Sequence, residues 1–165
     1  MSSFLKIALR NLLKGPSTDP YPFGETFVPK GLRGKIKYNA KACIACGMCE
    51  HVCAGGAIQI KETADKSGLE FIVWHNTCAF CGLCEHYCPT KAIRLTEDFH
   101  TAHSQEDKYR YVERGFIKYV TCARCATPMV PIAPELMTLA YGQVNKDIEK
   151  LRHLCPKCRQ KQSLR

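Results

Sequence analysis

The chain has 165 residues, a formal net charge of +9 at pH 7 and twelve cysteines. No stretch approaches the ~20 consecutive apolar residues that cross a bilayer, so we expect a soluble or peripheral protein. Disulfide frameworks are typical of short secreted chains, and the N-terminal residues contain no signal-peptide cleavage site. We therefore expect reduced cysteines and a cytoplasmic protein.

Residues 3–14 are predicted to form a short amphipathic helix that ends at Gly15-Pro16. Its basic residues recur at every fourth position, opposite an apolar face. Such a helix can lie at lipid headgroups or against a membrane subunit, and the alternative is that it packs on its own domain. Residues 15–34 contain four prolines and four glycines, which predicts an extended strap. Residues 1–34 are thus expected to be a docking segment.

Residues 43–88 hold eight of the twelve cysteines, in two runs of the form C-x2-C-x2-C-x3-C. This run is typical of bacterial ferredoxins that carry [4Fe–4S] clusters, and in two-cluster ferredoxins the fourth cysteine of each run ligates the other cluster. A pair of zinc sites is the alternative, but zinc sites rarely use three cysteines at this spacing. The predicted ligands are Cys43, Cys46, Cys49 and Cys88 for one cluster, and Cys78, Cys81, Cys84 and Cys53 for the other.

The two cysteine runs belong to an internal repeat with an offset of 35 residues. Gly47 corresponds to Gly82 in this repeat, and short strands are expected before and after each run. The repeat differs after the fourth cysteine, where Ala54 stands opposite Pro89. We therefore expect residues 35–96 to form an α+β, ferredoxin-type domain with pseudo-two-fold symmetry.

The remaining four cysteines lie in a C-terminal extension, residues 121–165, which follows a connector of residues 97–120 that becomes β-like near its end. Two C-x2-C pairs suit one tetrahedral zinc ion, although a single rubredoxin-like iron, a third cluster or an empty site are alternatives. One helix is expected over residues 135–154, with Gly142 as a point where it can break. With a single helix the extension is expected to lack a core of its own, and metal binding would supply its folding free energy. The predicted ligands are Cys122, Cys125, Cys155 and Cys158.

The chain contains no glycine-rich nucleotide motif and no catalytic constellation, so one-electron transfer is the expected chemistry. Part of the positive charge would offset the buried anionic clusters. For that reason we expect no nucleic-acid partner.

Residues 35–96 closely resemble the 2[4Fe–4S] ferredoxin family. The flanks, with the N-terminal helix, the Tyr21-Pro22 strap, Leu32-Arg33-Gly34-Lys35 and the C-terminal cysteine pairs, resemble the ferredoxin-like subunit of formate hydrogenlyase and related membrane-bound [NiFe]-hydrogenases. The two-cluster subunit of complex I is also similar.

This resemblance implies an electron relay from a formate dehydrogenase-type subunit to a hydrogenase small-subunit-like partner. It also implies a peripheral position on the cytoplasmic side of the inner membrane, with residues 3–14 against membrane subunits. The alternatives are a complex I-type subunit and a free soluble ferredoxin, and the latter makes no use of the helix, the strap or the extension.

Overall fold

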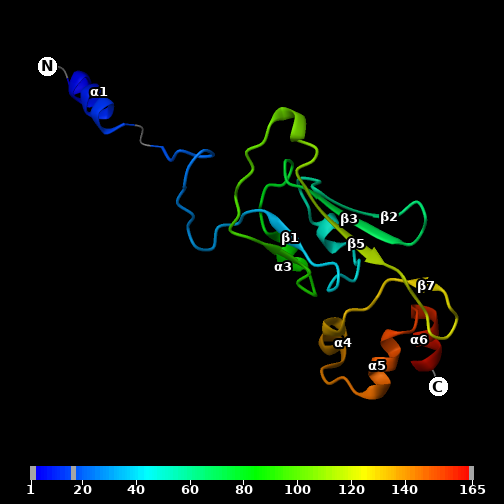
Figure 1. Ribbon diagram of the computed structural model, residues 1–165. Coiled ribbons are helices and arrows are strands. Elements are labelled where there is room, and N and C mark those ends of the chain that lie inside the picture. The colour runs from blue at the N-terminus through cyan, green and yellow to red at the C-terminus, as the bar shows by residue number, and fades with distance from the viewer. Residues whose placement is uncertain (1–2, 16–17, 164–165) are drawn as a thin grey trace. The chain divides into compact units, whose positions relative to one another are not determined.

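The computed structural model describes residues 3–15 and 18–163, and its helices and strands are labelled in Figure 1. The chain divides into two compact units, Met1–Leu32 and Arg33–Arg165. The expected helix stop at Pro16 lies outside the described residues. No helix in the described part of the chain is both long enough and apolar enough to cross a membrane.

The first unit contains the predicted amphipathic helix, α1 (Ser3–Lys14). Among the described residues of its unit, no element covers the apolar face, and Phe4, Leu12 and Leu13 are each more than three-quarters exposed. Beyond the helix, the strap has local turns: the Phe23 N–H donates to the Pro20 carbonyl over 2.8 Å.

The second unit begins with a pair of short antiparallel strands, β1 (Ile36–Tyr38) and β4 (Ile93–Leu95). Gly34 and Lys35 continue this pairing, because their N–H groups donate to the carbonyls of Thr96 and Asp98. Each cysteine run then folds as a loop that leads into a helix of one turn, and these helices are α2 (Met48–His51) and α3 (Leu83–Tyr87).

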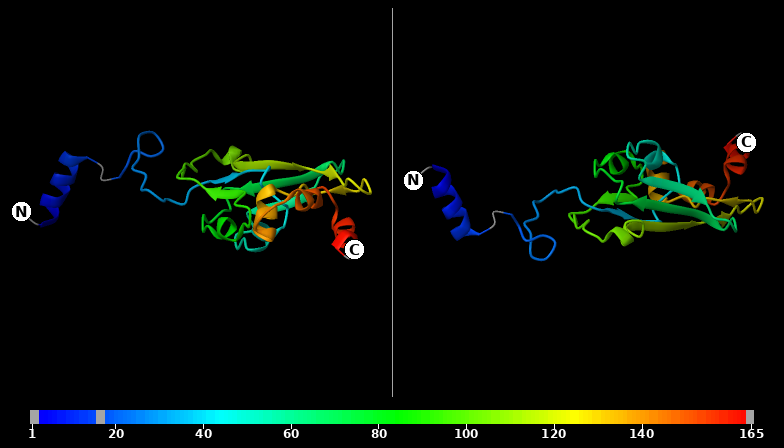
Figure 2. Two further views of the ribbon diagram at one scale, coloured as in Figure 1. Left: turned by 90° about the horizontal axis from the view of Figure 1, so that it is seen from below. Right: turned by 90° about the horizontal axis from the view of Figure 1, so that it is seen from above.

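A three-stranded antiparallel sheet forms the other layer, in the order β2-β3-β5. Its strands are β2 (Ile58–Glu62), β3 (Gly68–Trp74) and β5 (Val112–Lys118). Both views in Figure 2 show α2 and α3 on one side of this sheet. Between the layers lies an apolar core in which the cysteines of α2 and α3 pack with strand residues: Ile36, Cys49, Ile58, Phe71, Val73, Cys84 and Ile93.

The expected connector, residues 97–120, contributes a strand to this sheet. The sequence predicted β structure only from Phe116, but β5 begins at Val112 and pairs with β3 along its whole length. A short 3-10 helix, η1 (Gln105–Asp107), precedes it. Ile117 is only 2% exposed, so β5 takes part in the buried core and does not merely link two domains.

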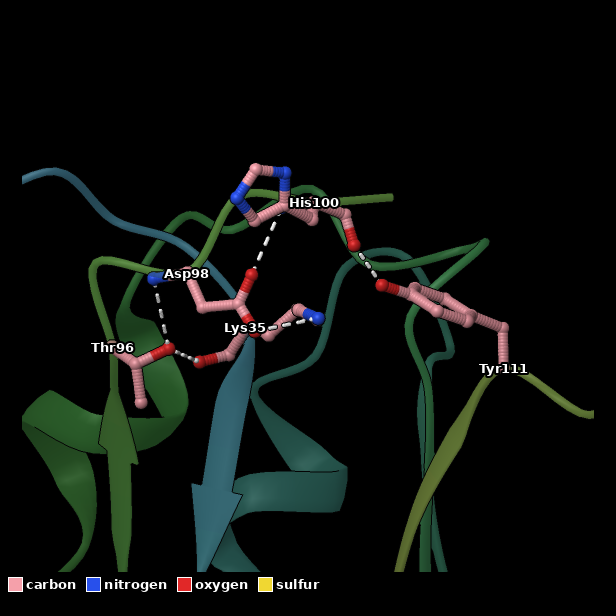
Figure 3. A network of polar contacts seen from close by, with 5 residues as sticks. All are labelled: Lys35, Thr96, Asp98, His100 and Tyr111. Atoms are coloured by element: carbon pink, nitrogen blue, oxygen red, sulfur yellow. Dashed lines mark hydrogen bonds and ion pairs between the residues drawn. The ribbon is translucent and has the colours of Figure 1, made fainter. Parts of the chain in front are cut away.

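A polar network joins the start of this connector to the start of β1 (Figure 3). The Lys35 ammonium pairs with the Asp98 carboxylate over 2.6 Å, and the Thr96 hydroxyl donates to the Lys35 carbonyl over 2.9 Å. Asp98 also accepts the His100 N–H, and the Tyr111 hydroxyl donates to the His100 carbonyl. These contacts fix the chain where it leaves β4 on its way to β5.

The C-terminal extension contains three short helices, where the sequence predicted one. Gly142, at φ 70°, ends the first helix, so the predicted break occurs there. The Asn145 side chain accepts the N–H groups of Asp147 and Ile148 and thereby starts the second. The helices are α4 (Pro134–Tyr141), α5 (Lys146–Arg152) and α6 (Pro156–Ser163), preceded by the hairpin of β6 (Val120–Thr121) and β7 (Pro128–Met129).

The extension has a small core of its own, so the expectation that it lacks one was wrong. Met129, Ile132, Met137 and Leu154 are buried together with three of its cysteines. The sequence pattern did not reveal this core because its apolar residues come from a hairpin, a loop and three short helices rather than from one periodic segment.

Candidate metal centres

The eight cysteines of the two runs line two separate hollows in the second unit. The first hollow, of about 20 Å³, is lined by Cys43, Cys46, Cys49 and Cys88. The second hollow, of about 120 Å³, is lined by Cys53, Cys78, Cys81 and Cys84. In each hollow, three thiols come from one run and the fourth from the other run. This grouping coincides with the crossed ligand sets that the sequence predicts.

Backbone N–H groups point at sulfur in equivalent places of the two runs. The N–H groups of Ala45 and Phe80 donate to the first cysteine of each run, in both cases over 3.4 Å. Ala57 and Ala92 donate to the fourth cysteines, Cys53 and Cys88, both over 3.2 Å. Such donors stabilise thiolate sulfur that carries negative charge, as the ligands of an iron–sulfur cluster do.

The loops reach this geometry through residues in the left-handed region of backbone space. Gly47 and Gly82 adopt φ values of 75° and 83° at the starts of α2 and α3. Ala45 and Phe80, which supply the N–H donors, have φ values of 51° and 49° although they carry side chains. Non-glycine residues in this region are strained and concentrate at functional sites. The same strain at both runs indicates that the loops are shaped around a ligand.

Burial opposes ionisation of the inner thiols. It raises the pKa of Cys49 to about 12 and that of Cys84 to about 11, with neighbouring cysteines as the next cause. Burial also raises the pKa of Cys43 and Cys78 above the ordinary value of 9.0. Four such thiols ionise together only when positive charge is placed among them, and the iron ions of a cluster provide it. The donor set therefore fits iron–sulfur clusters.

The two hollows are neighbours, and each has one exposed thiol. Helices α2 and α3 contact each other, and Cys84 of one hollow contributes to the raised pKa of Cys49 in the other. Cys46 and Cys81 are the exposed cysteines of the two runs. Clusters bound in the two hollows would therefore be close neighbours, each with one exposed thiol beside it.

Basic side chains gather around Cys81. A guanidinium nitrogen of Arg33 donates to the Cys81 carbonyl over 2.8 Å. The Lys91 ammonium donates to two carbonyls at the end of α3, and Arg94 lines the same open recess. In the internal repeat, Lys91 and Arg94 correspond to uncharged residues, Gly56 and Gln59. The recess beside Cys81 thus carries three basic side chains and one acidic side chain, Glu85.

Sequence reasoning missed Tyr38, which lies beside the first hollow. Its ring stacks on Phe71 at 3.8 Å between centroids, and its hydroxyl group is buried. The alternation in β1 could have revealed it, because Ile36 and Tyr38 point to the same side of the strand and Ile36 is in the core.

The four cysteines of the extension converge on one point. Their Sγ atoms all lie within 4.8 Å of one another, and the Sγ atoms of Cys125 and Cys155 are 3.6 Å apart. Cys122 accepts the Cys155 N–H over 3.2 Å, which ties the two pairs together. Cys122, Cys155 and Cys158 are buried, and Cys125 is exposed. This arrangement can hold one tetrahedral metal ion in a closed, structural site.

Hydrogen bonds prepare two of these thiols for metal binding. The Cys155 N–H, followed by that of Arg124, lowers the pKa of Cys122 to about 6. The Thr127 hydroxyl lowers the pKa of Cys125 below 9.0. Burial has the opposite effect on Cys158, whose pKa it raises to about 12. Metal binding would thus release a proton from Cys158 more than from Cys122.

Two comparisons with known proteins match part of the chain. Residues 42–92 match the family model of the 4Fe-4S dicluster domain. Over 63 residues the chain is 30% identical to NADH-quinone oxidoreductase subunit I of Carboxydothermus hydrogenoformans, a match that covers 38% of this chain and 45% of that protein.

Among solved structures, a chain of the membrane-bound sulfane sulfur reductase, described as an archaeal respiratory membrane complex, is similar at 26% identity and a TM-score of 0.45. That match covers 88% of this chain and 73% of the other. The chain spans less than half of the length of the curated relative named above. The matched segment contains all eight cysteines of the two hollows, and residues 42–92 are therefore a 4Fe-4S dicluster domain.

Proposed function

We propose that this chain is the electron-relay subunit of a membrane-associated oxidoreductase complex. The observation that carries the proposal is the pair of neighbouring four-cysteine hollows, each with one thiol at the surface. Two [4Fe–4S] clusters held there would take up and release single electrons. One cluster is held by Cys43, Cys46, Cys49 and Cys88, and the other by Cys78, Cys81, Cys84 and Cys53.

The repeated N–H···S bonds and left-handed residues support a pseudo-two-fold ferredoxin arrangement of these sites. The chain's own residues bind, orient and insulate the clusters. Burial of Cys49 and Cys84 keeps water from the space between the hollows, and the exposed Cys46 and Cys81 set where partners approach.

The partners that we propose are a formate dehydrogenase-type subunit on the input side and a hydrogenase small-subunit-like protein on the output side. The resemblance of the flanking segments supports this choice, and α1 offers an exposed apolar face for membrane subunits on the cytoplasmic side. A complex I-type subunit is the second candidate, which is favoured by the similarity to NADH-quinone oxidoreductase subunit I. In either case the four-cysteine extension holds zinc, or alternatively one iron, in a structural role.

The proposal is tested in membranes of the source organism that carry the double variant Cys53→Ala, Cys84→Ala. If the chain is the relay, formate-dependent hydrogen evolution is lost, while formate oxidation and hydrogenase activity, each measured with an artificial viologen dye, remain. Loss of NADH-dependent quinone reduction instead would support the complex I-type subunit. Unchanged activities, with the wild-type chain migrating near its monomer mass of 18.6 kDa, would identify a free ferredoxin.

A further inference from the structure

Tyr38 brings a buried hydroxyl group to the edge of the first hollow. It is the last residue of β1, and its Oη atom is shielded from solvent. The Cys43 thiol interacts with this hydroxyl, but no acceptor within residues 3–15 and 18–163 meets it with full hydrogen-bond geometry. A buried hydroxyl without a partner is unfavourable, and each such group in a folded protein requires an explanation.

The ring of Tyr38 is held so that its hydroxyl cannot turn elsewhere. On one side it stacks on Phe71, with an angle of 10° between the ring planes. Gly115 of β5 lies against the ring so closely that a Cβ atom there would overlap ring carbons. The Tyr38 N–H also donates to the Glu113 carboxylate over 3.3 Å. A glycine inside a strand often marks such a close approach.

The groups around the hydroxyl belong to the first ligand set. Burial raises the pKa of Tyr38 well above its ordinary value of 10.0, and the next cause is the Cys43 thiol, followed by Cys49 and Cys88. These three cysteines place the hydroxyl beside the first ligand set, where its O–H group can donate toward negatively charged sulfur.

The second hollow has no equivalent donor at this position. In the internal repeat, Tyr38 corresponds to Val73, which is completely buried and carries no polar atom. The strand partners correspond as well, because Tyr38 lies opposite Ile93 and Val73 lies opposite Ile58. The two ligand sets thus share their N–H donors but differ in their hydroxyl groups. The first set has that of Tyr38 and also that of Thr90, which lies 3.8 Å from the Cys88 sulfur and corresponds to Gly55 in the repeat.

We propose that the Tyr38 hydroxyl donates a hydrogen bond to sulfur of the cluster on Cys43, Cys46, Cys49 and Cys88, and thereby raises the reduction potential of that cluster alone. This inference rests on the ligand sets of the proposed function. Reduction adds one electron and makes the sulfur more negative, so the O–H donor stabilises the reduced form more than the oxidised form.

The test is a potentiometric titration of the anaerobically purified, cluster-loaded full chain, followed by electron paramagnetic resonance. Tyr38→Phe keeps the ring and removes the hydroxyl. One of the two midpoint potentials is expected to become more negative by about 59 mV. For a one-electron couple this corresponds to a tenfold change in the equilibrium constant of reduction. The control is Tyr119→Phe, whose hydroxyl bonds Glu62 at the surface and whose loss should shift neither potential.

The same substitution in a chain that lacks the first cluster shows which cluster's potential is shifted. In the double variant Cys43→Ala, Cys88→Ala, which lacks two ligands of the first set, Tyr38→Phe should leave the remaining potential unchanged. Electron–nuclear double resonance in D₂O should also lose one exchangeable deuteron signal in Tyr38→Phe and none in Tyr119→Phe.

An equal shift of both potentials, no shift of either, or a shift that persists in the Cys43→Ala, Cys88→Ala background would overturn the inference. These outcomes are separate from failure of the proposed function. That failure would appear as a wild-type chain that contains no pair of clusters to titrate.

Discussion

In each cysteine run, single backbone N–H groups are positioned to stabilise sulfur atoms that would bind a cluster. Ala45 and Phe80 adopt strained left-handed conformations, and in doing so they aim N–H groups at the sulfur atoms of Cys43 and Cys78. The strain is offset when these sulfur atoms bear the charge of a bound cluster. Because each hollow takes cysteines from both runs, a pair of cysteine substitutions removes ligands from one cluster or from both, depending on the pair.

Two double variants distinguish crossed from uncrossed ligation. Cys43→Ala with Cys88→Ala removes two ligands of one proposed cluster, so about half of the iron and sulfide should remain. Cys43→Ala with Cys53→Ala removes one ligand from each cluster and should abolish both. Iron and sulfide analysis of anaerobically purified chains measures the difference, and the reverse pattern would show that each run holds its own cluster.

Secondary-structure elements show how much of the fold the sequence could predict. The first helix, the strands beside each cysteine run and the break at Gly142 follow from local patterns, and all are present. The full extent of β5 was not predictable in this way, because its register depends on pairing with β3, some 40 residues earlier in the chain. Tyr38 was missed for a related reason: its role depends on Gly115, a glycine that lies against its ring in the fold.

The same limit applies to the metal sites. The spacing of the cysteines predicted every thiol that lines the hollows, since the run itself encodes a tight loop. The basic surface around Cys81 was not foreseen, because Arg33 lies 48 residues earlier in the chain and meets Cys81 only in the folded protein.

Substitution in β5 should destabilise the dicluster domain. Ile117→Ala removes a side chain that is 2% exposed in the core, and such changes cost about 2–5 kcal/mol. The neighbouring Lys118→Ala, on the exposed side of the strand, should change the free energy of unfolding by no more than about 0.5 kcal/mol. Anaerobic urea unfolding followed through cluster absorption makes the comparison. Equal small effects would mean that β5 is only a connector.

The C-terminal extension should depend on its metal and be independent of the clusters. Cys155→Ser removes one of four converging thiols, so the chain should lose its single zinc or iron and its extension should become sensitive to protease. Lys157→Ser, an exposed neighbour, is the control and should leave the metal content and the protease resistance unchanged. Metal analysis and limited proteolysis provide the readout, and a Cys155→Ser chain with a full complement of the extra metal would contradict the site.

At the scale of the whole molecule, the chain combines a dicluster domain with two appendages that a freely diffusing carrier does not need. The extension is folded around its own four thiols, and α1 exposes its apolar side chains within its unit. The basic recess beside Cys81 adds a surface suited to an acidic partner. These features together favour a fixed place in an assembly.

The docking role of α1 can be tested by charge placement. Leu9→Asp with Leu12→Asp puts two charges on the apolar face and should strongly reduce recovery of the chain with membranes, while iron content stays the same. Lys6→Gln with Arg10→Gln lowers the net charge by the same two units on the opposite, basic face and serves as the control. Equal recovery of all three proteins in the membrane fraction would exclude α1 as the anchor.

The central claim is that one chain carries two clusters close enough to exchange electrons. Its most direct test is quantitative electron paramagnetic resonance of the dithionite-reduced, anaerobically purified chain. The structure predicts two unpaired spins per chain, with signals broadened by magnetic interaction between the neighbouring centres. A single, unbroadened spin per chain, accompanied by iron for only one cluster, would contradict it.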